Sequence, residues 1–218
     1  MSDTHQCGGC GGCGSKGQAP QEPKKLAPNP LSQVGTVICV MGATDKSLVT
    51  AALAAELHRR GKQVAIFDAD ITTPSIQTLF EIPQGVTRGE AGLYPALTQD
   101  GVKLVSISLM LEDETDLITT RGAAMAAIVS QLWTGAIWDR VDVLLIDMPP
   151  GIQDVTALVL DDFPLDAALI LTPPGPLGGH HAAQLSRFAE THDVRTIACA
   201  QALDEANIAD IIAQIEEV

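Results

Sequence analysis

The chain is poor in positive charge and lacks long apolar stretches. Its 218 residues include 13 Lys and Arg against 27 Asp and Glu, giving a formal net charge of -14 and a pI near 4.5. Such a surface repels phosphodiester backbones and anionic lipid, so we expect neither nucleic acid nor membranes as partners. No apolar run approaches the roughly 18 residues of a membrane span, and no basic segment followed by an apolar one opens the chain. We therefore expect a cytoplasmic protein.

Cysteine is scarce as well, but three of the five cysteines lie close together in "CGGCGGC", as Cys7, Cys10 and Cys13. Because cytoplasmic thiols are kept reduced, this cluster favours metal binding over disulfides. The spacing matches the first three ligands of a bacterial ferredoxin run, and the Gly pairs let the backbone curl around a cubane cluster. The pattern indicates an iron-sulfur site; a zinc site or incidental cysteines in a Gly-rich segment are the alternatives.

The composition divides the chain at about residue 33. Residues 1–33 have no apolar periodicity and are rich in Gly, Pro, Gln and Ser, which predicts a flexible tail that ends in an extended, partly polyproline linker. From residue 34 to 218, apolar strands alternate with amphipathic helices. We expect one α/β domain here, with a mostly parallel sheet covered by helices on both faces. The strands are predicted at 36–40, 63–70, 102–109, 142–151, 165–174 and 195–200, and the helices at 47–61, 122–133, 179–192 and 205–218.

The segment after the first predicted strand resembles a damaged phosphate-binding loop. A Walker loop, G-x-x-x-x-G-K-[ST], binds phosphates with backbone N–H groups and Lys, and gives a hydroxyl to Mg²⁺. The eight residues here, "VMGATDKS", keep Lys46 and Ser47 at a helix start but lack both diagnostic glycines. If the loop binds nucleotide, the contacting residues are Gly42, Ala43, Thr44, Asp45, Lys46 and Ser47, with Ser47 also a Mg²⁺ ligand.

Three carboxylates support this interpretation. Asp147 ends the apolar run "VLLID", where a Walker B acid would hold Mg²⁺ through water, and Asp68 and Asp70 end another predicted strand. An acid at a strand end is often only a polar turn residue. Ligands of open parallel sheets bind at the carboxyl ends of the strands, however, so these acids are expected to converge beside Lys46 and Ser47.

These motifs together resemble those of the Mrp family of iron-sulfur cluster carriers, within the MinD/ParA-like P-loop ATPases. The resemblance covers about residues 34–200 and rests on "VAIFDADITTPSIQTLF", the "TRG" of 120–122, "VDVLLIDMPPGIQD" and "LDAALILTPP". It implies a homodimeric ATPase, or a heterodimer with a paralogue, that passes a labile [4Fe-4S] cluster to apoproteins or assembly factors. By position, Lys46 and Ser47 would contact phosphate and Mg²⁺, Asp68 and Asp70 would orient water and metal, and Asp147 would be the Walker B acid.

The sequence also departs from this family. Met41 stands where the resemblance implies a signature lysine that reaches the partner's nucleotide, and Asp45 replaces the Gly before Lys46. Two like charges about 4 Å apart repel by roughly 4 kcal/mol at an effective dielectric of 20, so the Asp45 carboxylate should weaken nucleotide binding. Asp tolerates the left-handed backbone better than most residues, so the loop shape itself can persist. We expect weak binding and slow or absent ATP turnover.

A second departure concerns the ligands of the iron-sulfur cluster. Members of the family usually carry a C-terminal C-x-x-C, whereas this chain has only Cys199 in that region. We therefore expect the three tail cysteines to bind the cluster, with a fourth ligand from His5, Cys199, an exogenous thiol or another chain. Cys39, inside an apolar strand, is expected in the core. His180 and His181 are expected on the surface at a helix start, and Trp133 and Trp138 in packing.

Two other classes of protein stay open. A non-catalytic pseudo-ATPase would use the same scaffold only to present the cysteine tail to a partner or paralogue, as the lost glycines and Met41 suggest. A positioning protein of the MinD or ParA type would need a basic membrane-binding helix or a basic DNA-facing patch. The last predicted helix, 205–218, is acidic, which argues against both positioning types.

Overall fold

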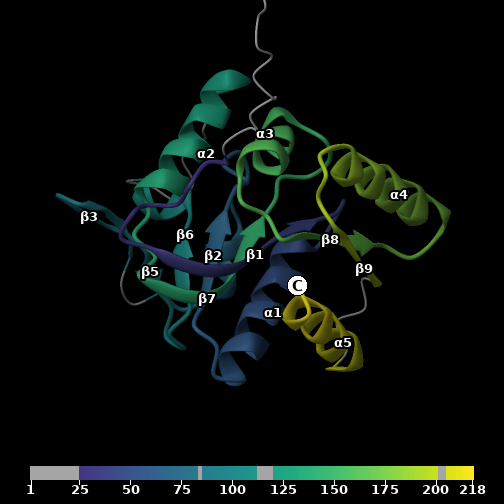
Figure 1. Cartoon of the computed structure of the whole chain (residues 1–218), viewed down its shortest axis with the longest axis horizontal. Helices are drawn as coiled ribbons and strands as arrows, with labels where there is room; N and C mark the ends of the chain where they lie inside the picture. Colours follow the sequence, from purple (N-terminus) through teal and green to yellow (C-terminus); the bar gives the residue numbers. More distant parts are fainter. Residues whose placement is uncertain (1–24, 83–84, 112–119, 201–204) are drawn as a thin grey trace, which may run out of the picture.

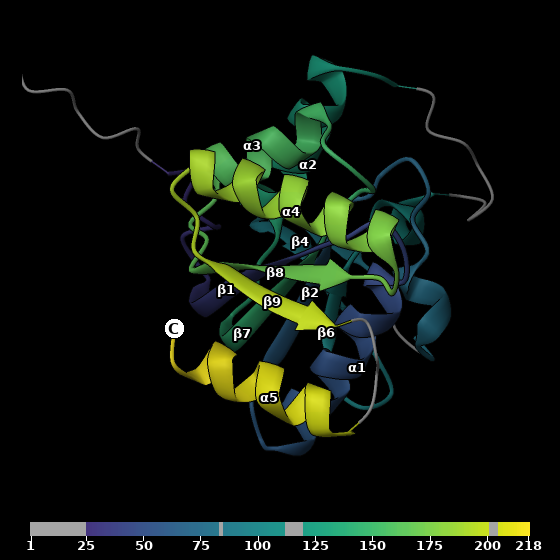
Figure 2. The same cartoon turned by 90° about the vertical axis from the view of Figure 1, so that its right-hand side faces the viewer.

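The computed structural model describes residues 25–82, 85–111, 120–200 and 205–218. Helices cover both faces of a central sheet in three layers (Figure 1). Figure 2 shows helices α2 (Ala123–Gly135), α3 (Asp154–Asp162) and α4 (Pro176–Thr191) over one face, and α1 (Lys46–Arg59) and α5 (Glu205–Glu216) over the other. The expected fold class, an α/β domain with a mostly parallel sheet, is confirmed. Within the described ranges, no helix is long and apolar enough to cross a membrane.

The sheet has seven strands, in the spatial order β5-β6-β2-β7-β1-β8-β9. All pairings are parallel except the one between the two-residue strand β5 and its neighbour β6. Helices supply the long crossovers that parallel pairing requires, except between β2 and β6, where the chain passes through the 3₁₀ turn Ile76–Leu79 and three short strands. In chain order the strands are β1 (Gln33–Met41), β2 (Val64–Asp68), β5 (Ala96–Leu97), β6 (Lys103–Val105), β7 (Arg140–Asp147), β8 (Ala167–Thr172) and β9 (Thr196–Ala200).

Successive side chains along a strand point to opposite faces of the sheet, so the hydrophobic core forms two clusters, one on each face. In β1, Val37, Cys39 and Met41 face the α2, α3 and α4 side, while Ile38 and Val40 face α1 and α5. Both faces of β1 are buried because helices cover both sides of the sheet. Cys39 is therefore a core residue, as predicted.

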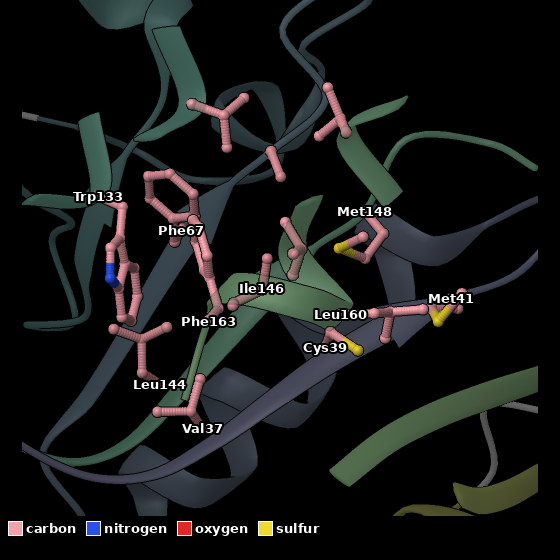
Figure 3. Packing of buried hydrophobic residues seen from close by; sticks show 14 of the residues in the cluster. Val37, Cys39, Met41, Phe67, Trp133, Leu144, Ile146, Met148, Leu160 and Phe163 are labelled. Carbon is pink, nitrogen blue, oxygen red and sulfur yellow. The ribbon is translucent and has the colours of Figure 1, made fainter. Parts of the chain in front are cut away.

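Aromatic side chains fill the core beneath α2 and α3. Trp133 and Phe163 stack with ring centroids 4.6 Å apart, and Phe67 meets Trp133 edge to face at 5.8 Å (Figure 3). Phe67 also meets Trp138 edge to face, at 6.4 Å. Burying a large aromatic side chain contributes roughly 2 to 3 kcal/mol. Trp133 and Trp138 are fully buried, so their expected role in packing is confirmed.

The prediction of one strand over residues 102–109 was wrong in its second half. Strand β6 ends at Val105, and residues Ile107–Met110 form a 3₁₀ turn. The change follows from Ser106, whose hydroxyl donates to Asp68 (2.7 Å) and lies 2.9 Å from the Ser108 hydroxyl, so this polar pair replaces continued strand pairing. The sequence also gave no sign of β5 or of a small hairpin, β3 (Thr87–Gly89) and β4 (Gly92–Tyr94).

Residues 25–32, which by composition belong to the tail, contact the domain. Lys25 donates to the carbonyls of Leu160 and Asp161 at the C-terminal end of α3, where a cation is favourable. The Trp133 indole donates to the Leu26 carbonyl at 2.8 Å, and the amide of Leu26 donates to the Asp162 carbonyl. The chain thus reaches the domain several residues before β1 begins.

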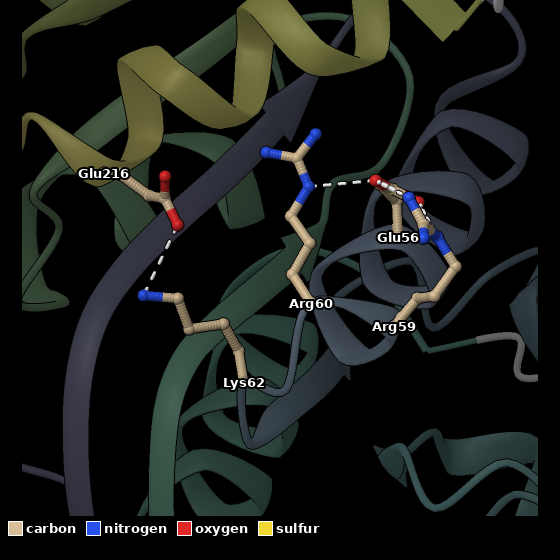
Figure 4. A network of polar contacts seen from close by, with 5 residues as sticks. All are labelled: Glu56, Arg59, Arg60, Lys62 and Glu216. Carbon is tan, nitrogen blue, oxygen red and sulfur yellow. Dashed lines mark hydrogen bonds and ion pairs between the residues drawn. The ribbon is translucent and has the colours of Figure 1, made fainter.

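A polar network marks the C-terminal end of α1, away from the loop that precedes this helix. Glu56 accepts hydrogen bonds from Arg59 and Arg60, and these bonds lower the pKa of Glu56 to about 2 (Figure 4). Lys62 lies 3.4 Å from a carboxylate oxygen of Glu216 in α5. The Lys62–Glu216 pair links the segment after α1 to α5, and the whole network lies at the opposite end of α1 from the loop that precedes this helix.

Candidate functional site

The carboxyl ends of β2 and β7 bring two aspartates together. The two strands pair in parallel, and Asp68 and Asp147, their last residues, are register partners. Both side chains are buried, with 1% and 2% exposure. The sequence-based expectation that these acids lie on neighbouring strands therefore agrees with the geometry.

The loop from Val40 to Ser47 leaves the end of β1, between β7 and β8, and enters α1. Asp45 adopts a left-handed backbone, with φ 57° and ψ 15°, immediately before Lys46 opens the helix. The loop thus keeps a conformation that glycine normally supplies, as the tolerance of Asp for this region suggested. A Cβ on Gly42 would lie 2.9 Å from Cβ of Leu171, so the loop passes too close to β8 for a side chain there.

Ser47 connects the loop to the strand-end carboxylates. Its hydroxyl donates to Asp147 Oδ2 at 2.5 Å and lies 3.2 Å from the hydroxyl of Ser75. The other carboxylate oxygen, Asp147 Oδ1, is buried and makes no hydrogen bond of good geometry among the described residues, although the Thr50 hydroxyl, also buried and unpaired, acts on this carboxylate and lowers its pKa. Leaving such an acceptor unsatisfied costs free energy, which indicates a place for a further donor or cation.

Burial and the charges of neighbouring carboxylates make both strand-end acids harder to ionise. Desolvation raises the pKa of Asp147 to about 6, against the opposing effects of the Ser47 hydrogen bond and the positive charge of Lys46. The pKa of Asp68 lies well above its ordinary value because of desolvation and then the charge of Asp147. Such shifts are typical of functional sites, where a bound cation would restore the charged forms.

Asp70 plays a different part from the two buried acids. It is half-buried, and its carboxylate accepts hydrogen bonds from the backbone and hydroxyl groups of Thr72 and Thr73. Its own amide donates to Asp68 Oδ1 at 3.0 Å. Asp70 therefore shapes the loop that carries Ser75 to Ser47, in addition to lining the cleft described next.

Two hollows meet above the loop. The first, here called the Lys46 lobe, encloses about 370 Å³ and the second, the α4 lobe, about 420 Å³; Ala43 and Pro150 line both. The Lys46 lobe is also lined by Asp45, Lys46, Ser47, Leu48, Asp70, Thr73, Ser75, Thr78 and Leu79. The α4 lobe is completed by Gly42, Gly151, Ile152, His181, Gln184 and Leu185.

These residues fit a Mg²⁺ ion held together with phosphates. The Ser47 hydroxyl and the unpaired Asp147 oxygen are hard oxygen donors, and Lys46, only 9% exposed, lies beside them. In the described ranges, no group of three or more His, Cys, Asp or Glu side chains is placed to hold a metal ion. Few protein ligands suit Mg²⁺, which usually keeps several waters and binds substrate phosphates as well.

The other predicted metal ligands are the three tail cysteines, with His5 or Cys199 among the candidates for a fourth ligand. Cys7, Cys10 and Cys13 lie outside the described residues, as does His5. Cys39 and Cys199 are buried, and burial raises the pKa of Cys39 to about 12.

Sequence analysis also made predictions for Met41 and for the histidine pair His180 and His181. Met41 is 1% exposed and packs in the core beneath α3 and α4, so this side chain cannot extend toward a partner subunit. His180 and His181 are exposed near the start of α4, as expected, although the helix begins earlier than predicted, at Pro176.

Sequence reasoning missed the hydroxyl groups of the site. The Ser75 hydroxyl contacts that of Ser47, and the Ser106 hydroxyl donates to Asp68 and contacts that of Ser108. Small polar residues in loops form no distinctive sequence pattern, so these contacts were not predicted. The position of Ser106 directly after the apolar residues of β6 was the one available signal, since it places a polar group at the carboxyl end of a strand.

Asp147→Asn should stabilise the protein when no nucleotide or metal is present. A folded-state pKa raised to about 6 means that the wild type loses stability as the pH rises from about 4 through 6, when Asp147 must ionise in a buried site. The variant avoids this cost, so we expect its unfolding free energy to be higher by about 2 kcal/mol at pH 7.5, with the difference closing near pH 4. Urea titrations in EDTA at both pH values measure this.

Asp100→Asn is the matched control, because Asp100 is exposed and should change stability by less than about 0.5 kcal/mol. An Asp147→Asn protein that is less stable than the wild type at pH 7.5 would contradict the assignment of buried charge.

A three-layer α/β fold with a strand-loop-helix turn beside strand-end acids defines a P-loop NTPase class of protein. The family model described as ParA, NUBPL iron-transfer P-loop NTPase, matches residues 31–211, and the chain belongs to this family. The resemblance inferred from the sequence is thereby confirmed.

Among solved structures, the chain is similar to a nucleotide-binding protein from Archaeoglobus fulgidus in complex with ADP. The TM-score is 0.55 at 24% identity, covering 85% of this chain and 89% of that one. At this identity the likeness supports the fold alone.

Curated relatives share higher identity. An iron-sulfur cluster carrier protein of Clostridium perfringens is 36% identical over 63% of this chain and 51% of its own length, and one of Methanococcus maripaludis is 33% identical over 77% and 60%. The cytosolic Fe-S cluster assembly factor nubp2 of Danio rerio is 32% identical over 66% and 58%. The matches therefore span about half to three fifths of these relatives.

Proposed function

We propose that this protein binds an iron-sulfur cluster and delivers it to apoproteins or assembly factors, under the control of Mg-ATP. The observation that carries the nucleotide part is the contact of Ser47 with Asp147, whose second oxygen is buried and unpaired beside Lys46. The iron-transfer part is supported by the family match and by the names of the relatives from Clostridium perfringens and Danio rerio. A cytoplasmic location belongs to the same proposal.

The nucleotide would bind in the Lys46 lobe. Lys46 would contact the phosphates, Ser47 would ligate Mg²⁺, and Asp147 would hold the ion through water. A bound Mg²⁺ supplies neutralisation of phosphate charge. Gly42, Ala43, Thr44 and Asp45 form the loop around the phosphates, and Asp68 and Asp70 fix the neighbouring segment that ends at Ser75. The exposed Asp45 carboxylate weakens affinity without altering the loop shape.

The cluster would be held by Cys7, Cys10 and Cys13 as a [4Fe-4S] cluster with one ligand from elsewhere. Cys39 is excluded as that ligand by its place in the core and by its raised pKa, since a cysteine binds iron as the thiolate. A cluster with an incomplete set of protein ligands suits a carrier, because an apoprotein can replace the weak ligand first.

Two copies would face each other across the nucleotide cleft. Exposed apolar side chains surround it, from α1, the 3₁₀ turn after β2, the loop after β7 and the start of α4: Leu48, Leu79, Ile152 and Leu177, with exposures of 43% to 76%. Such a group of apolar side chains favours a protein contact. A second copy of this chain is the simplest partner for this surface, and a paralogue in a heterodimer would bind the same surface.

Leu177→Asp should abolish any dimer that Mg-ATP induces. Leu177, at 76% exposure, is the most exposed of these side chains, and a carboxylate there would be desolvated in the contact. We expect the light-scattering mass in Mg-ATP to fall from dimer to monomer. Leu31→Asp, also exposed but preceding β1 at the opposite edge of the sheet, should leave the dimer intact. If Leu177→Asp still forms a dimer in Mg-ATP, the face around the nucleotide cleft is not the dimer interface.

A second candidate function is that of a pseudo-ATPase which presents the cysteine tail without hydrolysis. The observation that favours it is the buried Met41, which leaves this loop position without a cation. Anaerobic reconstitution with iron and sulfide, followed by phosphate release in Mg-ATP, separates the two candidates. A loaded cluster with phosphate release supports the ATPase, and a loaded cluster without it supports the pseudo-ATPase. Failure to take up any cluster would overturn both.

A further inference from the structure

The α4 lobe is a second hollow, and of its lining residues the proposed nucleotide contacts use only Gly42 and Ala43. It opens on the far side of Ala43 and Pro150 from the Lys46 lobe. Its walls come from the phosphate loop, from the loop after β7 and from α4. Because Ala43 and Pro150 line both hollows, a ligand whose phosphates lie against Lys46 can extend a terminal group into the α4 lobe.

Acidic side chains outnumber basic ones around the two lobes. Among the described lining residues, only Lys46 and His181 can carry a positive charge, while Asp45 and Asp70 line the cleft and two further aspartates lie buried beneath it. A Mg-bound nucleoside triphosphate brings a net charge of about -2 to this site, and catalysis of phosphoryl transfer depends on neutralising such charge. His181 is therefore the remaining cationic partner that the site offers.

The backbone of the α4 lobe also suits an anion. Gly151 has a φ of +74°, and nothing lies within 4 Å of the position that its Cβ would take. Its amide donates no hydrogen bond to any residue within the described ranges. Ile152 and Leu185 supply apolar walls, and a less polar surrounding strengthens hydrogen bonds and charge interactions with a bound phosphate.

We propose that the α4 lobe receives the terminal phosphate of a bound nucleoside triphosphate and that His181 contacts this phosphate directly. The inference rests on the proposed nucleotide site and adds a residue that distinguishes a triphosphate from a diphosphate. An imidazole donates a hydrogen bond to a phosphate oxygen in either protonation state and adds a positive charge when protonated. Because only the triphosphate extends into the α4 lobe, His181 contributes to ATP affinity and not to ADP affinity.

His180 provides a matched control within the same helix. It is exposed like its neighbour, and the two rings lie 6.3 Å apart, yet His180 does not line the α4 lobe. Replacing either histidine changes the helix surface in the same way. A general effect on folding or net charge would therefore appear in both variants, whereas contact with a terminal phosphate would appear only at His181.

The experiment is isothermal titration of the full chain with Mg-ADP and with a non-hydrolysable Mg-ATP analogue, at one fixed pH. We expect His181→Ala to lower affinity for the ATP analogue by about fivefold to tenfold, with ADP affinity unchanged, since a charge-assisted hydrogen bond is lost. His180→Ala should match the wild type for both nucleotides. His181→Lys should keep preference for the analogue, and His181→Gln should retain only part of it.

The outcomes separate this inference from the proposed function. If the wild type binds both nucleotides and His181→Ala binds the analogue as tightly, the inference is wrong and the nucleotide site stands. Equal losses for both nucleotides in His181→Ala would assign His181 a structural role and would also overturn the inference. If the wild type binds neither nucleotide, the proposed nucleotide function fails and the inference falls with it.

Discussion

Changing Cys7, Cys10 and Cys13 together to Ala should remove nearly all iron that the protein takes up during anaerobic reconstitution. These residues supply the C-x-x-C-x-x-C spacing, and thiolates are the ligands on which such clusters depend. We expect iron and sulfide contents to fall to about a tenth of the wild-type values or less, and the absorbance near 400 nm to disappear. Iron and sulfide assays on the same preparations measure the change.

Cys39→Ala is the control for this experiment. Cys39 is buried in β1 with a pKa raised to about 12, so its thiol stays protonated and should not bind iron. The variant should load as much cluster as the wild type, at a stability cost of about 1 kcal/mol for a small packing change. A triple variant that retains its cluster would rule out the tail as the binding site.

Lys46→Met should strongly weaken the binding of Mg-ATP. Lys46 opens α1 and is 9% exposed, and it is the only basic side chain among the described residues that line the Lys46 lobe. Met keeps much of the side-chain volume and removes the charge, so the loss should report on phosphate contact rather than on packing. We expect affinity to fall by at least about thirtyfold, which corresponds to roughly 2 kcal/mol.

Lys62→Met applies the same substitution away from the cleft. Lys62 follows the C-terminal end of α1 and lies 3.4 Å from Glu216, an exposed pair whose loss should not affect nucleotide binding (Figure 4). Titration with a fluorescent ATP analogue compares the two variants. Equal affinities for Lys46→Met and the wild type would show that this loop is not a phosphate site.

Most of the pattern of strands and helices was predictable from the sequence because apolar strands alternate with helical segments. Helix α3, between β7 and β8, was not predicted. The convergence of Ser47, Asp68 and Asp147 followed as well, since the carboxyl ends of parallel strands meet at one edge of the sheet. The left-handed conformation of Asp45 was also within reach, because Asp is among the few residues that adopt it readily.

Other features depend on tertiary contacts that leave little trace in the sequence. Ser106 ends β6 early because its hydroxyl finds Asp68, which lies 38 residues away along the chain. Lys25 and Leu26 read as linker residues, yet the end of α3 and the indole of Trp133 give them partners. The α4 lobe joins three separate segments, so a role for His181 could not be inferred before the helix was placed beside the loop.

Cluster transfer tests the central claim most directly. The wild type would be loaded anaerobically, freed of unbound iron and mixed with apo-ferredoxin in the presence of an iron chelator, with and without Mg-ATP. The account predicts holo-ferredoxin despite the chelator, at a rate that Mg-ATP changes in the wild type but not in Lys46→Met. Capture of all the iron by the chelator, with no holo-ferredoxin formed, would contradict direct delivery of a cluster by this protein.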